Sequence, residues 1–519
     1  MTDKTKILRS AWVITLFTLT SRVFGYIRDQ RITLLLGTSL SADSFVLAYR
    51  IPNLLRRLVG EGSMTAAFIP VFTSYLAREE REAVWKFANR VFWTLALVVG
   101  AVTVLGMAYS SQIVHFFTLF GGPSGEWSLA VYLNRIIFPF LFFISLSALA
   151  MAILNSFHVF GLPAASPILA NLVIIAMSFG VIYRPLMQFA PEQYRTPAVV
   201  LAAAVVIGGA LQFLIQVPEL VRRGMDFHFN ISFSDPGIRK VARLTVPGFF
   251  GIGVYQVNFF IGTIFATSSR MPRGSITSLY VAERITELVL GAFAISVATA
   301  ILPMMSMQAA SGDFETLKKT MVFSMRTVFF VAVPAALALV LLRQPIVQVL
   351  FQHGQFSNDS TALTSRALLY YAIGLPAFAG VKLIVPAFYS LHDMMSPVRV
   401  AAYAMLLNLA LNLIFIEMFF QTLYNGSPAL ATSLSAYFNF GLLFIILSQR
   451  LGRLGTRGLA NSFVKIVACA VAMEFVCYAI LRVSNFSSYQ HFLPRLAVLA
   501  VLVAAGLLSY LGMARLLRC

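Results

Sequence analysis

Apolar runs of roughly 20 residues recur from one end of this chain to the other. A helix of that length spans the hydrocarbon core of a bilayer, which is about 30 Å thick. A lipid-embedded backbone must satisfy its own hydrogen bonds, and a helix does so within a single segment. The composition agrees, because 59% of the 519 residues are hydrophobic, 11% are charged and the mean hydropathy is +0.82. The sequence therefore predicts an all-α polytopic membrane protein.

Counting the runs predicts about 14 transmembrane helices. They cover residues 7–37, 41–77, 84–117, 127–156, 164–184, 197–221, 237–268, 275–307, 316–343, 360–390, 397–421, 427–449, 458–482 and 491–516. Several are longer than a bilayer requires, so we expect tilts or breaks in them. The first run continues past the length of a signal-peptide core without a small-residue cleavage site, which predicts a retained helix.

Basic residues outnumber acidic ones, with 39 Lys and Arg against 20 Asp and Glu and a net charge of +19. They concentrate in alternate loops, from Lys4, Lys6 and Arg9 at the start to Arg515 and Arg518 at the end. Because cytoplasmic loops collect positive residues, this distribution predicts that both termini are cytoplasmic. An anionic substrate is a second explanation of the same charge. We do not expect a nucleic-acid partner for a chain this apolar.

An internal repeat is visible in the sequence. The segments "NSFHVFGLP" (155–163) and "YSLHDMMSP" (389–397) share Ser, His and Pro in register, at a separation of 392 − 158 = 234 residues. The same separation aligns "AYRIPNLL" (48–55) with "AERITELV" (282–289). Since six is even, a duplication of six helices starts both copies on the same side, related by an axis along the membrane normal. We predict two pseudo-symmetric six-helix lobes, 1–232 and 233–450, and two C-terminal helices in 451–519.

Charged residues interrupt three of the predicted helices. A charge at the bilayer centre costs about 2.5–3.5 kcal/mol on insertion scales, so such residues face a protein interior or a water-filled cavity. The first helix places Ser21, Arg22, Arg28 and Asp29 around Gly25; the second carries Asp43, Arg50, Pro52, Arg56, Arg57 and Glu61; the eighth carries Thr277, Glu283, Arg284 and Glu287.

Helical spacing sorts the second of these clusters. Arg50, Arg57 and Glu61 share a face, whereas Arg56 points about 100° away. Pro52 and the "GEG" at 60–62 can bend or open this helix, and Gly25 is a further candidate flexible point.

Two interpretations of the three clusters compete. In the first, they line one central cavity in which arginine exceeds acid, and the acids balance the charge of the empty site. Guanidinium groups bind phosphate oxygens in pairs and keep their charge, so this interpretation predicts a diphosphate ligand. In the second, Arg22 with Asp29 and Arg57 with Glu61 are ion pairs that pin helices, and the long side chains snorkel to the surface.

Other polar residues carry weaker signals. His158 and His392 lie at equivalent hairpin turns, where capping and proton relay are the alternatives. Lys382 and Glu474 are lone charges whose roles stay open, and the three cysteines lack metal-ligand spacing. No nucleotide-binding loop, metal-binding motif, nucleophile elbow or dinucleotide fingerprint occurs, so we expect no cofactor, no metal and no enzymatic activity.

The segments "SRVFGYIRD", "DSFVLAYRIPNLLRRLVGEGSMTAAFIPVF" and "AERITELVLGAFAISVATAILP" resemble the MurJ (MviN) lipid II flippases of the MOP exporter superfamily. The resemblance runs the full length. It implies two six-helix bundles around a central cationic cavity, a groove of helices 13 and 14 for the undecaprenyl tail, and a place in the bacterial inner membrane. The family's essential positions fall on Ser21, Arg22, Arg28, Asp43, Arg56, Thr277, Arg284 and Glu287, with Thr277 replacing a Ser seen in relatives.

The resemblance also implies a mechanism, alternating access that carries lipid II from the inner to the outer leaflet. Some relatives have a sodium-site carboxylate on helix 7, but Gly262 occupies the corresponding place here, so a coupling ion or the membrane potential stays open. Alternatives are a flippase for another polyprenyl-diphosphate glycan, a cation-coupled drug exporter of the superfamily, and a membrane enzyme acting on such lipids. A drug exporter for cations would need an acidic cavity, and an enzyme would need a positioned base.

Overall fold

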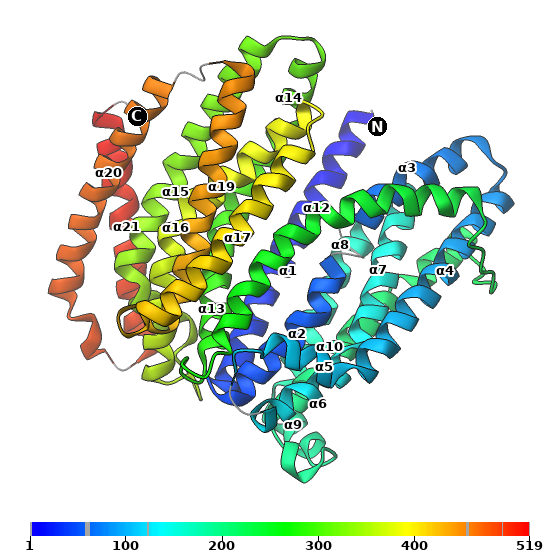
Figure 1. Cartoon of the computed structure of the whole chain (residues 1–519), viewed down its shortest axis with the longest axis horizontal. Helices are drawn as coiled ribbons and strands as arrows, with labels where there is room; N and C mark the ends of the chain where they lie inside the picture. Colours follow the sequence, from blue (N-terminus) through cyan, green and yellow to red (C-terminus); the bar gives the residue numbers. More distant parts are fainter. Residues whose placement is uncertain (1–2, 58–62, 122–123, 453–455, 490, 518–519) are drawn as a thin grey trace. The chain divides into compact units, whose positions relative to one another are not determined.

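The computed structural model describes residues 3–57, 63–121, 124–452, 456–489 and 491–517. Within these ranges the regular structure is entirely helical (Figure 1). The chain divides into two compact units, one of residues 1–256 with 267–269 and one of residues 257–266 with 270–519. The predicted lobe boundaries remain a prediction.

The first unit contains α1 to α11 and the start of α12. Their bounds are α1 Asp3–Leu36, α2 Leu40–Arg56, α3 Ser63–Arg78, α4 Arg81–Ala108, α5 Ser110–Phe117, α6 Ser128–Ile137, α7 Pro139–Ser156, α8 Gly161–Met177, α9 Gly180–Met187, α10 Pro197–Leu214, α11 Val217–Arg223 and α12 Pro236–Ala266. Its core combines aromatic side chains of α3 and α4 with aliphatic side chains of α7, and Phe68, Phe72 and Phe87 are fully buried.

The second unit contains the remaining helices. Their bounds are α13 Ser275–Val289, α14 Ile295–Ala310, α15 Phe314–Phe351, α16 Asn358–Ser390, α17 Met395–Met418, α18 Phe420–Leu423, α19 Ser427–Leu451, α20 Thr456–Ser484 and α21 Phe492–Leu516. A π-helical turn, Leu290–Ala294, joins α13 to α14. The core runs from α14 to α21 and includes buried Cys469 and Cys477, so the last two helices are packed into this unit.

Each of the 14 predicted segments coincides with a helix or with consecutive helices. Nine helical stretches of the described residues are long and apolar enough to cross a membrane, and ten if α8 and α9 count as one span bent by 74°. The prediction of an all-α membrane protein is confirmed. The count of about 14 crossings remains a prediction.

The 234-residue repeat reappears in the helix boundaries. α7 ends at Ser156 and α16 at Ser390, while α8 begins at Gly161 and α17 at Met395. His158 and His392, in the turns between, both have positive φ, 60° and 58°. Each donates its backbone N–H to the carbonyl three residues back, and the next residue donates to the carbonyl five residues back. These are the two hydrogen bonds of a Schellman cap, which supports the capping alternative for both histidines.

Candidate functional site

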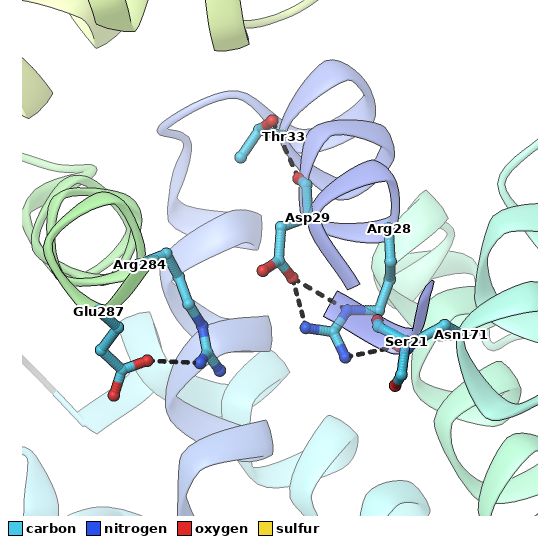
Figure 2. A network of polar contacts seen from close by, with 7 residues as sticks. All are labelled: Ser21, Arg28, Asp29, Thr33, Asn171, Arg284 and Glu287. Carbon is cyan, nitrogen blue, oxygen red and sulfur yellow. Dashed lines mark hydrogen bonds and ion pairs between the residues drawn. The ribbon is translucent and has the colours of Figure 1, made fainter. Parts of the chain in front are cut away.

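Arg28 lies at the centre of a polar network on α1. Its Nε and Nη2 donate to Oδ1 of Asp29, at 2.9 and 2.7 Å, and its Nη1 donates to Oδ1 of Asn171 on α8 at 3.0 Å. Figure 2 shows the guanidinium between these two side chains. Asn171 also donates from Nδ2 to the carbonyl of Ser21 at 3.3 Å. One amide of α8 therefore holds α1 at two positions, two turns apart.

Asn171 was not among the predicted residues. It is buried, and a Cβ added at Gly25 would lie 3.8 Å from its Nδ2, so α1 and α8 approach each other closely here. α1 continues through Gly25 without a break. The one sequence signal was an amide within an apolar helix, where a polar side chain without a partner is costly.

Arg31 makes a second contact between the same helices. Its Nε donates to Oγ of Ser178 at 2.9 Å and its Nη2 to the Ser178 carbonyl at 3.1 Å. The guanidinium also lies 4.4 Å from the ring centroid of Phe179. These bonds give partners to the hydroxyl and the backbone carbonyl of Ser178, where α8 ends and the chain bends into α9.

The predicted residues of α2 are spread from its first turn to its last. Asp43 is 3% exposed in the first turn, where the helix dipole favours a negative charge. Arg56 donates from Nε to Oδ1 of Asn53 at 2.9 Å. Arg50 and Arg57 are half-buried, and α2 contains Pro52 without interruption. Glu61 and the "GEG" segment lie outside the described residues.

The α13 residues form a separate group in the second unit. Nη1 of Arg284 donates to Oε2 of Glu287 at 2.7 Å, one turn along the helix (Figure 2). The guanidinium lies 4.9 Å from the ring centroid of Tyr280. Thr277 is buried on the same helix, and Glu283 is half-buried. The π-helical turn begins three residues after Glu287, and such turns are frequent at functional sites.

The alternative ion pair of Arg22 with Asp29 is wrong. Asp29 pairs with the adjacent Arg28 at 2.7 Å, and Arg22 is exposed. Two of the proposed ligand arginines, Arg28 and Arg284, thus have a carboxylate on their own helix. The net positive charge that they offer is smaller than a count of arginines suggests.

Gly262 is buried near α19. A Cβ added there would lie 3.7 Å from Cβ of Pro428 and 3.9 Å from Oγ1 of Thr432. A glycine supplies no carboxylate at this place. Within the described residues, no three His, Cys, Asp or Glu side chains lie together as a metal site.

Comparison with known families identifies the chain. Residues 32–498 match the family described as Lipid II flippase MurJ. This chain belongs to the MurJ family. Among its relatives is a probable lipid II flippase MurJ of Vibrio cholerae, 36% identical over 86% of this chain and 83% of that protein. A second, from Haemophilus influenzae, is 32% identical over 95% of this chain and 98% of that protein.

Solved structures show the same fold. A lipid II flippase MurJ in an inward closed conformation has a TM-score of 0.78 at 24% identity, over 97% of this chain and 98% of that one. An inward-facing multidrug resistance MATE transporter of the MOP superfamily has a TM-score of 0.68 at 15% identity, over 86% and 99%. The MurJ chain described here therefore has the architecture of MOP superfamily transporters, as the sequence predicted.

Proposed function

We propose that this MurJ family member is a transporter that flips lipid II from the inner to the outer leaflet of the bacterial cytoplasmic membrane. The observation that carries the proposal is the family match over 467 residues, from 32 to 498. Relatives named as lipid II flippases cover most of the chain, and the fold is that of a MurJ structure. No observation in the described residues favours another polyprenyl-diphosphate glycan or an enzymatic reaction over this one.

The diphosphate of the head group is bound, in this proposal, by Arg28, Arg56 and Arg284. Guanidinium forks match phosphate oxygens. Arg28 already directs two of its nitrogens, Nε and Nη2, to one carboxylate oxygen, Oδ1 of Asp29. Arg28 and Arg284 would exchange their carboxylate partners for the incoming phosphate, and the carboxylates would keep the unloaded site close to neutral. Six further residues contribute to binding in this proposal, namely Ser21, Arg22, Asp43, Thr277, Glu287 and the newly found Asn171.

The proposal also covers the undecaprenyl tail of lipid II and the transport cycle. Exposed apolar side chains of α20 and α21, such as Phe475, Val503 and Leu507, would contact the undecaprenyl chain. Alternating access would move the head group while the tail stays in an apolar environment. Because Gly262 offers no carboxylate, we propose that transport does not depend on sodium at that place.

A vesicle assay tests the proposal. Purified protein is reconstituted with labelled lipid II, and the label on each leaflet is followed with time. The triple variant Arg28→Ala, Arg56→Ala, Arg284→Ala should lose transport. A control with the same change in charge, Arg184→Ala, Arg399→Ala, Arg515→Ala, alters exposed arginines elsewhere and should keep it. Unchanged transport in the first variant would refute the assigned residues.

The same vesicles distinguish transport of lipid II from an enzymatic reaction on it. A flippase leaves lipid II chemically intact, so chromatography of the extracted lipid should return the starting compound alone. Polymerised glycan or released phosphate would identify a membrane enzyme and overturn the proposed function.

A further inference from the structure

The segment 224–235, between α11 and α12, lies along the side of α4, and we call it the strap. Asn89 of α4 donates from Nδ2 to Oδ1 of Asp226. Nη1 of Arg90 binds Oδ2 of Asp235 at 2.6 Å. The indole Nε1 of Trp93 donates to the strap carbonyl of Phe227 at 3.2 Å. Three side chains within about one turn of α4 therefore hold a segment that has no helix of its own.

Both ends of the strap are fixed as well. Nη2 of Arg81, the first residue of α4, donates to the carbonyl of Arg223 at 2.7 Å. At the other end, Oδ1 of Asp235 accepts the backbone N–H of Gly237 at 2.8 Å at the start of α12. These contacts fix the position of the strap within the first unit.

The charges of α4 place the strap relative to the bilayer. Arg90 is the last charged residue of that helix, and residues 91–108 carry none. A helix of this length extends about 27 Å, close to the ~30 Å of the hydrocarbon core. The edge of the core therefore lies near Arg90, and the strap contacts α4 on both sides of it, from Asn89 to Trp93.

At this level the strap exposes aromatic side chains. Phe229 is 73% exposed and Phe233 is 58% exposed. Phe229 packs on Trp93 at its inner edge, with ring centroids 5.1 Å apart, and leaves the rest of its surface uncovered. Segments that lie at the boundary between headgroups and acyl chains bury Phe, Trp or Leu there and carry Lys and Arg on their polar side. The general tendency of cytoplasmic loops to be basic does not explain exposed phenylalanines.

Basic side chains lie next to the strap. The side chain of Arg222 is 79% exposed, and Lys240 and Arg243 are exposed on the first turns of α12. Arg222 lies 3.9 Å from Glu219, whereas Lys240 and Arg243 form no ion pair with the described residues. Each such residue near an anionic membrane surface adds to the electrostatic attraction between the protein and the membrane.

We propose that the strap is an interfacial anchor. It inserts Phe229 and Phe233 at the boundary between headgroups and acyl chains of the adjacent leaflet, and Arg222, Lys240 and Arg243 bind anionic phospholipid headgroups there.

Site-directed fluorescence tests the insertion. In a Cys519→Ser background, Phe229→Cys and Phe233→Cys are each labelled with an environment-sensitive fluorophore; the background without these changes measures labelling of Cys469 and Cys477. Ser311→Cys, in the exposed turn between α14 and α15, is the matched control. The full-length protein is reconstituted in phosphatidylcholine vesicles with or without phosphatidylglycerol.

Lipids brominated at shallow acyl positions should quench the labels at 229 and 233 several-fold more than the label at 311. Aqueous iodide should show the opposite order. Iodide quenching at 229 and 233 equal to that at 311 would show that the strap faces water or awaits another partner, and would overturn the proposal.

The charge contribution has its own readout. Phosphatidylglycerol should deepen the quenching of both strap labels, and added salt should reduce this gain. In Arg222→Gln, Lys240→Gln, Arg243→Gln, the gain should disappear while the quenching in pure phosphatidylcholine remains. If the protein with Arg222, Lys240 and Arg243 intact shows the same quenching with and without phosphatidylglycerol, headgroup binding is refuted.

Discussion

At the scale of single residues, two of the intramembrane arginines pair with a carboxylate on their own helix. Arg28 pairs with the next residue and Arg284 with the carboxylate one turn on. An isolated charge in a bilayer is costly, and a partner on the same helix lowers this cost before any other helix is in place. The paired arginines remain partly accessible, with side-chain exposures of 15% and 27%. In the proposed function, an arriving diphosphate would exchange with these carboxylates.

We expect Asn171→Ala to lower the initial rate of lipid II transport without preventing folding. The change removes hydrogen bonds to Arg28 and Ser21 that fix the guanidinium. A hydrogen bond contributes about 0.5–1.5 kcal/mol, which corresponds to a two- to tenfold effect. Asn134→Ala is the control, because Asn134 is also buried and bonded, to Ser110, away from Arg28.

The two variants should lower the thermal unfolding midpoint by similar amounts. Only Asn171→Ala should weaken the dependence of the transport rate on the lipid II concentration. Equal kinetic losses in the two variants would assign Asn171 a purely structural role.

Asp393, in the turn between α16 and α17, predicts a pH effect on stability. Burial raises its pKa, but hydrogen bonds from Ser396 and Met395 and the charge of Arg450 outweigh burial and hold the pKa below the ordinary 3.8. Oδ2 lies 2.5 Å from Nη1 of Arg450. A lowered pKa stabilises the folded state at neutral pH, and this contribution is lost as the pH falls through the lowered value.

Thermal unfolding in detergent at neutral and acidic pH checks this effect. Asp393→Asn should lower the midpoint at neutral pH and narrow the difference between the two pH values. Glu315→Gln, which alters an exposed carboxylate, should leave that difference unchanged. An unaltered difference in Asp393→Asn would contradict the prediction.

At the scale of helices, glycines set how closely neighbouring elements approach. A Cβ at Gly374 of α16 would lie 2.7 Å from Cβ of Ser433 on α19. Ser433 cannot easily move, because its Oγ donates to the carbonyl of Tyr370 at 2.7 Å. Gly441, also on α19, has no atom within 4 Å of an added Cβ. Small residues at close helix contacts are a general feature of membrane proteins.

We therefore expect opposite effects from the same substitution at these two glycines. Gly374→Ala should destabilise by about 1–3 kcal/mol through overpacking. Gly441→Ala should be neutral or stabilise by up to about 1 kcal/mol through helix propensity. Unfolding midpoints measure both, and Ser433→Gly should rescue Gly374→Ala. Equal stability of the two alanine variants would contradict the close contact.

At the scale of the whole molecule, the charge bias of the loops predicts the orientation in the membrane, with both termini cytoplasmic. Predicted helices 1 to 5 end near α9, so the segment 188–196 should lie opposite the termini. Green fluorescent protein fused to either end should fluoresce, since it matures in the cytoplasm. Alkaline phosphatase inserted in 188–196 should be active. Phosphatase activity at a terminus would reverse the assignment.

The sequence by itself determined the membrane class, the helical segments, the repeat and the family. Hydropathy is a local property, and each membrane helix satisfies its backbone within itself, so runs of apolar residues mark helices without knowledge of their neighbours. The equivalence of His158 and His392 was also readable, because a helix cap depends on a few adjacent residues.

Only the tertiary structure decided which partners the polar side chains take. The bonds of Asn171 to Arg28 and of the strap to α4 join residues more than a hundred positions apart. Arg22 and Asp29, one heptad apart, were a reasonable pair by spacing, but Asp29 lies within reach of Arg28. Side-chain pairing depends on how helices pack in three dimensions, and the order of residues along one helix does not specify that packing.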